Sequence, residues 1–204
     1  HIVLKPSNYA PATSQMIFRL ISECFPAEQA AVVLGGRVEN QQLLDEHFDY
    51  IFFTGGVTVG KIVQEKAAKY LTPTTLELGG KSPCIVDDSA DIKLAARRIA
   101  FGKALNAGQT CVAPDYLLVH SDVKKKLLKE IAACWQEFYG NALENPAWPQ
   151  MISPRHYARA MELMDKEIIY CGGIGDGIRI APTILDRVTW ASPIMQEEIF
   201  APIL

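Results

Sequence analysis

Residues 50–60 read YIFFTGGVTVG, an apolar run that turns on two glycines into a helical pattern. The continuous apolar run at 50–53 predicts a buried strand. The helix that follows should bury one face, because its apolar residues recur at helical spacing: Val59, Ile62, Val63, Ala67 and Tyr70. A buried strand that passes directly into a helix is typical of α/β architecture with a parallel sheet.

The same alternation of short apolar runs and helical segments continues on both sides of this unit. It predicts strands at 2–4, 31–34, 74–78, 84–86 and 116–119, and helices at 14–24, 41–47, 91–105, 121–138 and 154–166. Ser121 or Asp122 is expected to cap the fourth of these helices. Residues 168–171 and 179–181 are expected to form a hairpin around the glycine-rich segment 172–177. The fold class predicted is α/β with a largely parallel sheet.

Composition excludes several classes of protein. The chain has 204 residues, of which 49% are hydrophobic and 21% charged, as in ordinary globular domains. A net charge of −3 gives no basic stripe for nucleic acid; the one short run, residues 124–126, is expected on the wet face of a helix. Four isolated histidines and five cysteines without CxxC spacing predict no metal site. With no secretory signal and no apolar run near about 18 residues, a cytoplasmic protein is expected.

Both ends of the chain look like the interior of a longer protein. Residues 2–4 read as the middle of a strand, and the last six residues form an apolar run. The chain has no initiator methionine. We therefore expect a central fragment of a larger protein.

The turn at Gly55-Gly56, with Gly60 in the helix, is a candidate dinucleotide-phosphate site. A helix N-terminus offers free N–H groups and a positive dipole end, and glycines allow a ligand close to the backbone. The GGxxxG spacing departs from the standard GxGxxG fingerprint, so a tight turn without a ligand remains an alternative. A literal scan for that fingerprint would place Glu77, 22 residues after Gly55, on the ribose.

Two further segments carry groups suited to catalysis. Glu77 ends an apolar strand beside Gly79-Gly80, where it is either a partly desolvated general base or a solvent-facing carboxylate. Cys111 lies in a predicted loop, as a reactive thiolate should, although an inert thiol is an alternative. The other four cysteines, at 24, 84, 134 and 171, are expected to be small core residues.

Together these segments resemble the aldehyde dehydrogenase superfamily over the whole chain. The resemblance rests on five motifs in order: Lys5-Pro6-Ser7, Phe53-Thr54-Gly55, Glu77-Leu78-Gly79-Gly80-Lys81-Ser82-Pro83, Gly108-Gln109-Thr110-Cys111 and Gln196-Glu197-Glu198-Ile199-Phe200. The segments at 71–73 and 111–116 look most like the class 3 branch, which oxidises medium-chain, fatty and aromatic aldehydes. The resemblance implies a Rossmann-like cofactor domain, of which residues 1–78 are the second half. Residues 79–204 would then be a truncated catalytic domain.

Residue roles follow from the same resemblance. Cys111 matches the nucleophile and Glu77 the general base that activates water, which replaces the ribose assignment. Lys5 matches the lysine on the adenosine ribose, and Gly55 and Gly60 match the cofactor-binding glycines. Glu198 matches the glutamate on the nicotinamide ribose, and Phe200 the aromatic residue beside the nicotinamide.

Three departures from the family pattern affect the expected cofactor site. Asn8 replaces the usual glutamate, which removes repulsion toward a 2′-phosphate, so both NAD and NADP are expected cofactors. Gly56 replaces a serine and loses a hydroxyl donor, although its backbone N–H remains a cofactor-binding group. Ala201 replaces a glycine, which we expect to be a mild change.

The implied activity is NAD(P)-dependent oxidation of an aldehyde to an acid through a cysteine thiohemiacetal and thioester. The family's oxyanion asparagine lies before Lys5, outside this chain, so the chain alone is expected to be inactive and its parent a homodimeric enzyme. The alternatives are a thioester hydrolase that does not bind NAD(P) and a catalytically dead dinucleotide-binding remnant.

Overall fold

The computed structural model describes all 204 residues, and the chain divides into two compact units, His1–Leu78 and Gly79–Leu204. Three of the four strand pairs are parallel, which confirms the predicted α/β class. No helix is both long and apolar enough to span a bilayer.

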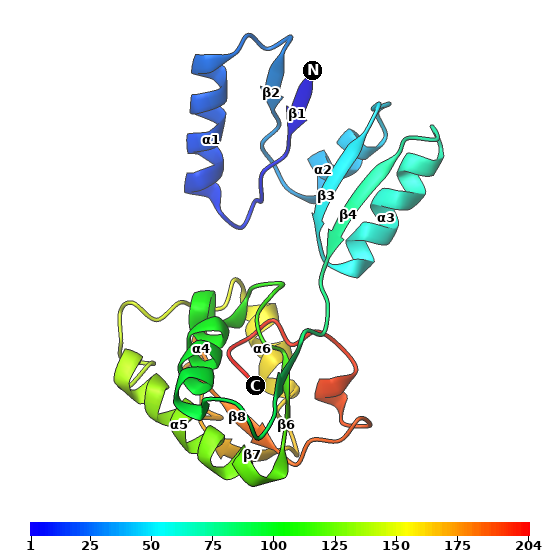
Figure 1. Ribbon diagram of the computed structural model, residues 1–204. Coiled ribbons are helices and arrows are strands. Elements are labelled where there is room, and N and C mark those ends of the chain that lie inside the picture. The colour runs from blue at the N-terminus through cyan, green and yellow to red at the C-terminus, as the bar shows by residue number, and fades with distance from the viewer. The chain divides into compact units, whose positions relative to one another are not determined.

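The first unit consists of two strand–helix–strand repeats (Figure 1). In the first, β1 (Ile2–Leu4) and β2 (Ala30–Val32) pair in parallel around α1 (Pro11–Cys24). After α2 (Arg37–Leu44), β3 (Ile51–Gly55) and β4 (Thr74–Leu78) pair in parallel around α3 (Val57–Ala68). Parallel strands need such a crossover, so α1 and α3 each connect two neighbouring strands.

The second unit begins with a third parallel pair. Strands β5 (Pro83–Val86) and β6 (Tyr116–Val119) are connected through α4 (Ile92–Ala104) and the 3₁₀ turn η1 (Leu105–Gly108). Helices α5 (Ser121–Tyr139) and α6 (Pro154–Glu162) follow. Strands β7 (Ile168–Cys171) and β8 (Ile184–Asp186) pair antiparallel, and the 3₁₀ turn η2 (Pro193–Met195) precedes the last residues.

Two apolar cores hold the second unit together. In the first, α4 packs on α5 through side chains that include Ala96, Ala100, Leu127 and Ile131. The second gathers α6 and the last residues of the chain around Ala160, Ile180, Ile199 and Ile203. The segment around Ile199 is therefore fixed by burial as well as by hydrogen bonds.

Several local predictions need correction. Neither Ser121 nor Asp122 caps α5; the cap is His120, whose Nδ1 accepts the Asp122 N–H. The partner of β7 is β8, whereas the glycine-rich segment forms only an isolated bridge between Gly175 and Ile180. Helices α1 and α2 begin three and four residues earlier than predicted, α1 with a proline at its first position.

Candidate active site

Cys111 lies in an exposed loop that follows a left-handed turn. Asn106, Ala107 and Gly108 have φ values of 51°, 52° and 70°, which abruptly end α4. A Cβ on Gly108 would lie 2.2 Å from the carbonyl oxygen of Ala201. Glycine is therefore required here, because it allows the Cys111 loop to contact the segment that carries Glu198 and Phe200.

Polar contacts fix the loop after Gly108. The Gln109 amide donates to the carbonyl of Gln150 at 3.1 Å and accepts the Ile152 N–H at 2.8 Å. The Ser82 hydroxyl donates to the carbonyl of Cys111 at 3.4 Å. Gln109 and Ser82 both belong to the quoted motifs, and their contacts hold the thiol-bearing backbone in place.

The other cysteines differ from Cys111 in their surroundings. Burial raises the pKa of the Cys84, Cys134 and Cys171 thiols, which disfavours their thiolates. The prediction that all four are core residues is wrong for Cys24, which is exposed at the last residue of α1. Cys24 lies on a surface helix end, and no catalytic group accompanies it in the sequence motifs.

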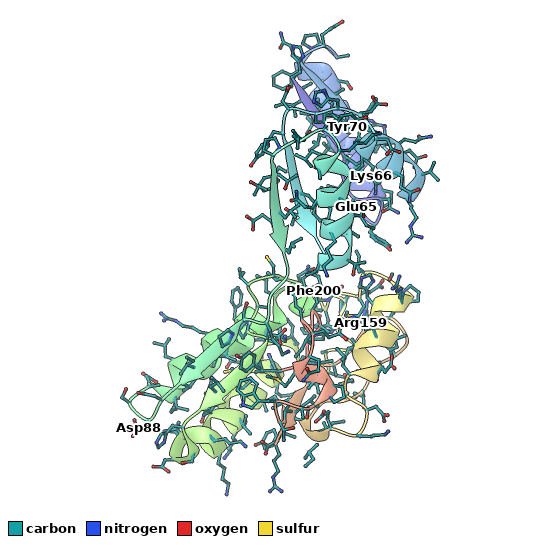
Figure 2. All side chains as sticks on the ribbon, turned by 90° about the vertical axis from the view of Figure 1, so that its right-hand side faces the viewer. Glu65, Lys66, Tyr70, Asp88, Arg159 and Phe200 are labelled. Carbon is teal, nitrogen blue, oxygen red and sulfur yellow. The ribbon has the colours of Figure 1, made fainter.

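Glu198 lies directly over the glycine pair that follows β4. A Cβ on Gly79 would lie 1.8 Å from Glu198 Oε2, so only glycine leaves room for this carboxylate. Burial raises the pKa of Glu198, and the Gly80 backbone N–H partly offsets that rise. Phe200, two residues later, has a φ of 50°, a strained value for an aromatic residue. It is labelled with Arg159 in Figure 2.

Lys103 is a buried cation that the sequence analysis did not single out. Lys103 lies on α4 and is only 1% exposed. Burial lowers the pKa of Lys103 to about 8, although the carboxylates of Asp115 and Glu198 oppose that shift. Its charge therefore makes a net unfavourable contribution to folding at neutral pH.

Replacing Lys103 with methionine is expected to stabilise the second unit at pH 7 by up to about 3 kcal/mol. The unfolded chain keeps this proton up to about pH 10.5 and the folded chain only up to about pH 8. The free energy of unfolding should therefore increase as the pH is raised from about 8 to about 10.5, and Lys103→Met should remove that increase. Urea unfolding across this range measures it, with the exposed Lys93→Met on the same helix as control. A destabilised Lys103→Met protein would contradict the expectation.

In the first unit, Glu77 and the glycine turn lie at the same sheet edge. Thr54 pairs with Glu77 and Gly55 with Leu78, so both strands end together. Glu77 is exposed at the end of β4. Such carboxyl edges of parallel strands are where α/β proteins bind ligands.

The glycines of this turn have different surroundings. Gly56 caps α3, and a Cβ added to it would meet nothing within 4 Å, which leaves open space at the helix N-terminus. Gly60 is buried, and a Cβ there would lie 2.7 Å from Leu78 Cδ2, so this glycine packs α3 onto β4. Lys5 follows β1, and its ammonium donates to the Pro6 carbonyl at 2.7 Å.

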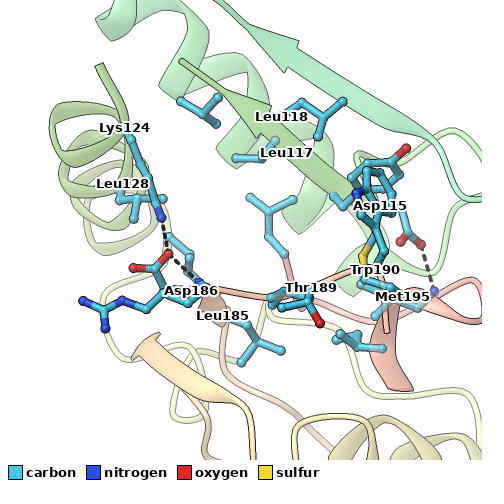
Figure 3. A pocket seen from close by; sticks show the side chains of 18 residues that line it. Asp115, Leu117, Leu118, Lys124, Leu128, Leu185, Asp186, Thr189, Trp190 and Met195 are labelled. Atoms are coloured by element: carbon cyan, nitrogen blue, oxygen red, sulfur yellow. Dashed lines mark hydrogen bonds and ion pairs between the residues drawn. The ribbon is translucent and has the colours of Figure 1, made fainter. Parts of the chain in front are cut away.

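One cavity of the second unit lies away from Cys111. It has a volume of about 530 Å³, and Asp115, Leu128, Leu185, Trp190 and Met195 are among its lining residues (Figure 3). Neither Cys111 nor Glu198 lines it. Its walls are largely apolar, and the contacts drawn there tie Lys124 to Asp186 and Asp115 to a backbone N–H.

Comparison with known proteins assigns the chain to a family. The model of the aldehyde dehydrogenase family matches residues 1–204, and the chain belongs to that family. It is 48% identical to 4,4'-diaponeurosporen-aldehyde dehydrogenase of Staphylococcus aureus, covering 99% of this chain and 45% of that protein. It is 42% identical to the dimeric NADP-preferring aldehyde dehydrogenase of Canis lupus familiaris, covering 100% of this chain and 46% of that protein.

Solved structures agree with this assignment. The substrate-bound state of Staphylococcus aureus AldH matches with a TM-score of 0.93 and 48% identity, covering 99% of this chain and 45% of that one. An aldehyde dehydrogenase of Mycobacterium tuberculosis complexed with NAD⁺ matches with a TM-score of 0.88 and 30% identity, over 100% and 45% of the two chains. The chain thus spans less than half the length of these relatives. Family 3 members are among them, as the class 3 resemblance predicted.

Proposed function

We propose that the full-length protein containing this chain oxidises an aldehyde to a carboxylic acid with NAD or NADP. The observation that carries the proposal is the exposed Cys111 loop. Gly108 allows this loop to lie close to the segment that carries Glu198 and Phe200. We propose residues 1–78 as the second half of the cofactor domain and residues 79–204 as part of the catalytic domain. The substrate we propose is a fatty or aromatic aldehyde, in keeping with the family 3 relatives.

The residues present fit a dinucleotide. The N-terminus of α3 has open space at Gly56, where its N–H groups and dipole would bind a phosphate. Gly60 lets α3 lie close to β4, and Lys5 at the end of β1 would hold the adenosine ribose. Glu198 would accept hydrogen bonds from the hydroxyls of the nicotinamide ribose, and Phe200 would lie beside the nicotinamide.

The proposed mechanism uses two side chains of this chain. The Cys111 thiolate attacks the aldehyde carbonyl and forms a thiohemiacetal. NAD or NADP held there would accept the hydride that leaves the thiohemiacetal carbon, and the Cys111 sulfur would then carry the acyl group as a thioester. Glu77 then takes a proton from water, the hydroxide attacks the thioester carbonyl, and the acid leaves as the Cys111 thiolate is restored.

The direct test is NAD(P)H formation by the full-length protein with a long-chain or aromatic aldehyde. Absorbance of the reduced cofactor should rise in proportion to the acid formed. Hydrolysis of a thioester without any affinity for NAD(P) would instead support the hydrolase alternative. Cofactor binding without turnover would support a catalytically dead remnant.

Gly79→Ala is expected to weaken cofactor binding about 10–100-fold, as for a lost hydrogen bond to a charged group. The added Cβ would occupy the position of Glu198 Oε2 and displace that carboxylate. The matched control is Gly80→Ala, where nothing lies within 4 Å of the new Cβ. Fluorescence titration with NADH measures both variants, and equal dissociation constants for the two would contradict the assignment of Glu198.

Two properties of the whole protein complete the proposal. A homodimer is supported by the relative named as a dimeric NADP-preferring enzyme. A cytoplasmic location is supported by five free cysteines, since thiols stay reduced there. Sedimentation of the full-length protein would test the first.

A further inference from the structure

Three charged side chains from separate elements hold the segment that carries Glu198. Lys81 follows the glycine pair, Asp115 precedes β6, and Arg159 lies on α6. All three contact residues 194–199, although they are distant from it in the sequence. Below, Lys81, Asp115 and Arg159 are called the clamp.

The contacts of Lys81 and Asp115 form a buried ion pair that grips backbone. Asp115 is only 3% exposed. One of its carboxylate oxygens accepts a hydrogen bond from the Lys81 ammonium, and the other accepts one from the Ile199 N–H at 2.8 Å. The same ammonium donates to the carbonyls of Ile194 and Glu197 at 2.8 and 2.9 Å. One ion pair thus fixes three backbone groups around Glu198.

Arg159 contacts the same segment from α6. Its Nη1 donates to Glu197 Oε2 at 2.8 Å and to the Glu198 carbonyl at 3.2 Å, and its Nη2 donates to the Ile199 carbonyl. Figure 2 shows Arg159 on α6 beside the C-terminal segment. The planar guanidinium supplies several donors in a fixed geometry, which a lysine would not reproduce.

The clamp contacts a segment that burial also anchors. Ile199 is already buried in the second core, so burial alone would anchor this part of the chain. What the clamp adds is the direction of the backbone on both sides of Glu198, whose carboxylate must lie over Gly79. A carboxylate that binds two ribose hydroxyls needs its backbone fixed to within about 0.5 Å.

We propose that Lys81, Asp115 and Arg159 are positioning residues that fix the Glu198 carboxylate for the nicotinamide ribose. The inference rests on the proposed function. The clamp touches neither substrate nor cofactor and acts through the backbone of residues 197–199. Its loss weakens cofactor binding through Glu198 and through no other group.

The test uses Arg159→Gln in the full-length protein, because the Arg159 side chain is part-exposed and its loss leaves no buried charge. NADH titration should show cofactor binding weakened about tenfold. In a Glu198→Gln background the same change should add little, because the residue that Arg159 positions is already lost. Arg159→Lys should recover only part of the loss. The control is Arg97→Gln, which breaks an exposed ion pair with Glu137 and should leave binding unchanged.

Amide hydrogen exchange without cofactor provides a second readout. Arg159→Gln should speed exchange in residues 194–200 while leaving α4 and α5 protected. Faster local exchange with unchanged cofactor binding would overturn the positioning role, as would full additivity with Glu198→Gln. If Arg159→Gln changes exchange as expected but the wild-type protein itself binds no NAD(P), the proposed function is wrong instead. If Arg159→Gln fails to fold, Arg159→Lys, which keeps a positive charge at this position, replaces it in the same cycle with a smaller expected loss.

Discussion

Cys111→Ala is expected to abolish aldehyde oxidation in the full-length protein while leaving NAD(P) binding intact. No thiohemiacetal can form without the sulfur, so kcat should fall by about 10⁴-fold or more, as when other covalent nucleophiles are removed. Cys111 lies in an exposed loop outside the helices and strands, so its truncation creates no core cavity. Thermal unfolding should therefore be nearly unchanged.

The control for this variant is Cys24→Ala, which removes the other exposed thiol. Its activity should equal that of the wild type. Iodoacetamide gives an independent comparison: labelling of Cys111 should track the loss of turnover, whereas labelling of Cys24 should not. Burial raises the pKa of the Cys84, Cys134 and Cys171 thiols, so these should react slowly. Turnover by Cys111→Ala within tenfold of the wild type would exclude Cys111 as the nucleophile.

Much of the fold could be predicted from the sequence because the chain repeats one local rule. Apolar runs bounded by glycine and proline gave strands such as β4 and β6 at the predicted residues. The errors occur where local signals mislead. Histidine is an uncommon N-cap, so His120 was not expected to cap α5. Strand β7 pairs with β8, where Ile184 and Leu185 are buried, and not with residues 179–181, which are nearer in the sequence.

The candidate site was predictable only in part. Cys111, Glu77 and Glu198 lie in short motifs, so residue type and spacing single them out. Arg159 lies on an ordinary amphipathic helix, 38 to 40 residues before the groups it contacts, and Asp115 lies 84 residues from Ile199. No local pattern encodes such contacts, since they arise only when distant elements pack. The buried ammonium of Lys103 was hidden for the same reason.

Glu77→Gln is expected to separate the two halves of the proposed reaction. The amide keeps the size of the side chain but cannot take a proton from water, so thioester hydrolysis should slow by about 10²–10⁴-fold. Cys111 is untouched, so the thioester should still form once. Rapid mixing with NAD⁺ and aldehyde should therefore give a burst of about one NADH per site, followed by a slow steady rate.

The burst itself distinguishes the role of Glu77. A base that acts only on water leaves the burst rate unchanged, whereas a base that also activates the Cys111 thiol would slow the burst as well. Glu65→Gln, an exposed glutamate on α3 in the same unit, is the control and should behave as the wild type. Because Glu77 is itself exposed at the end of β4, the substitution should not destabilise that unit. An unchanged steady rate in Glu77→Gln would mean that another group activates the water.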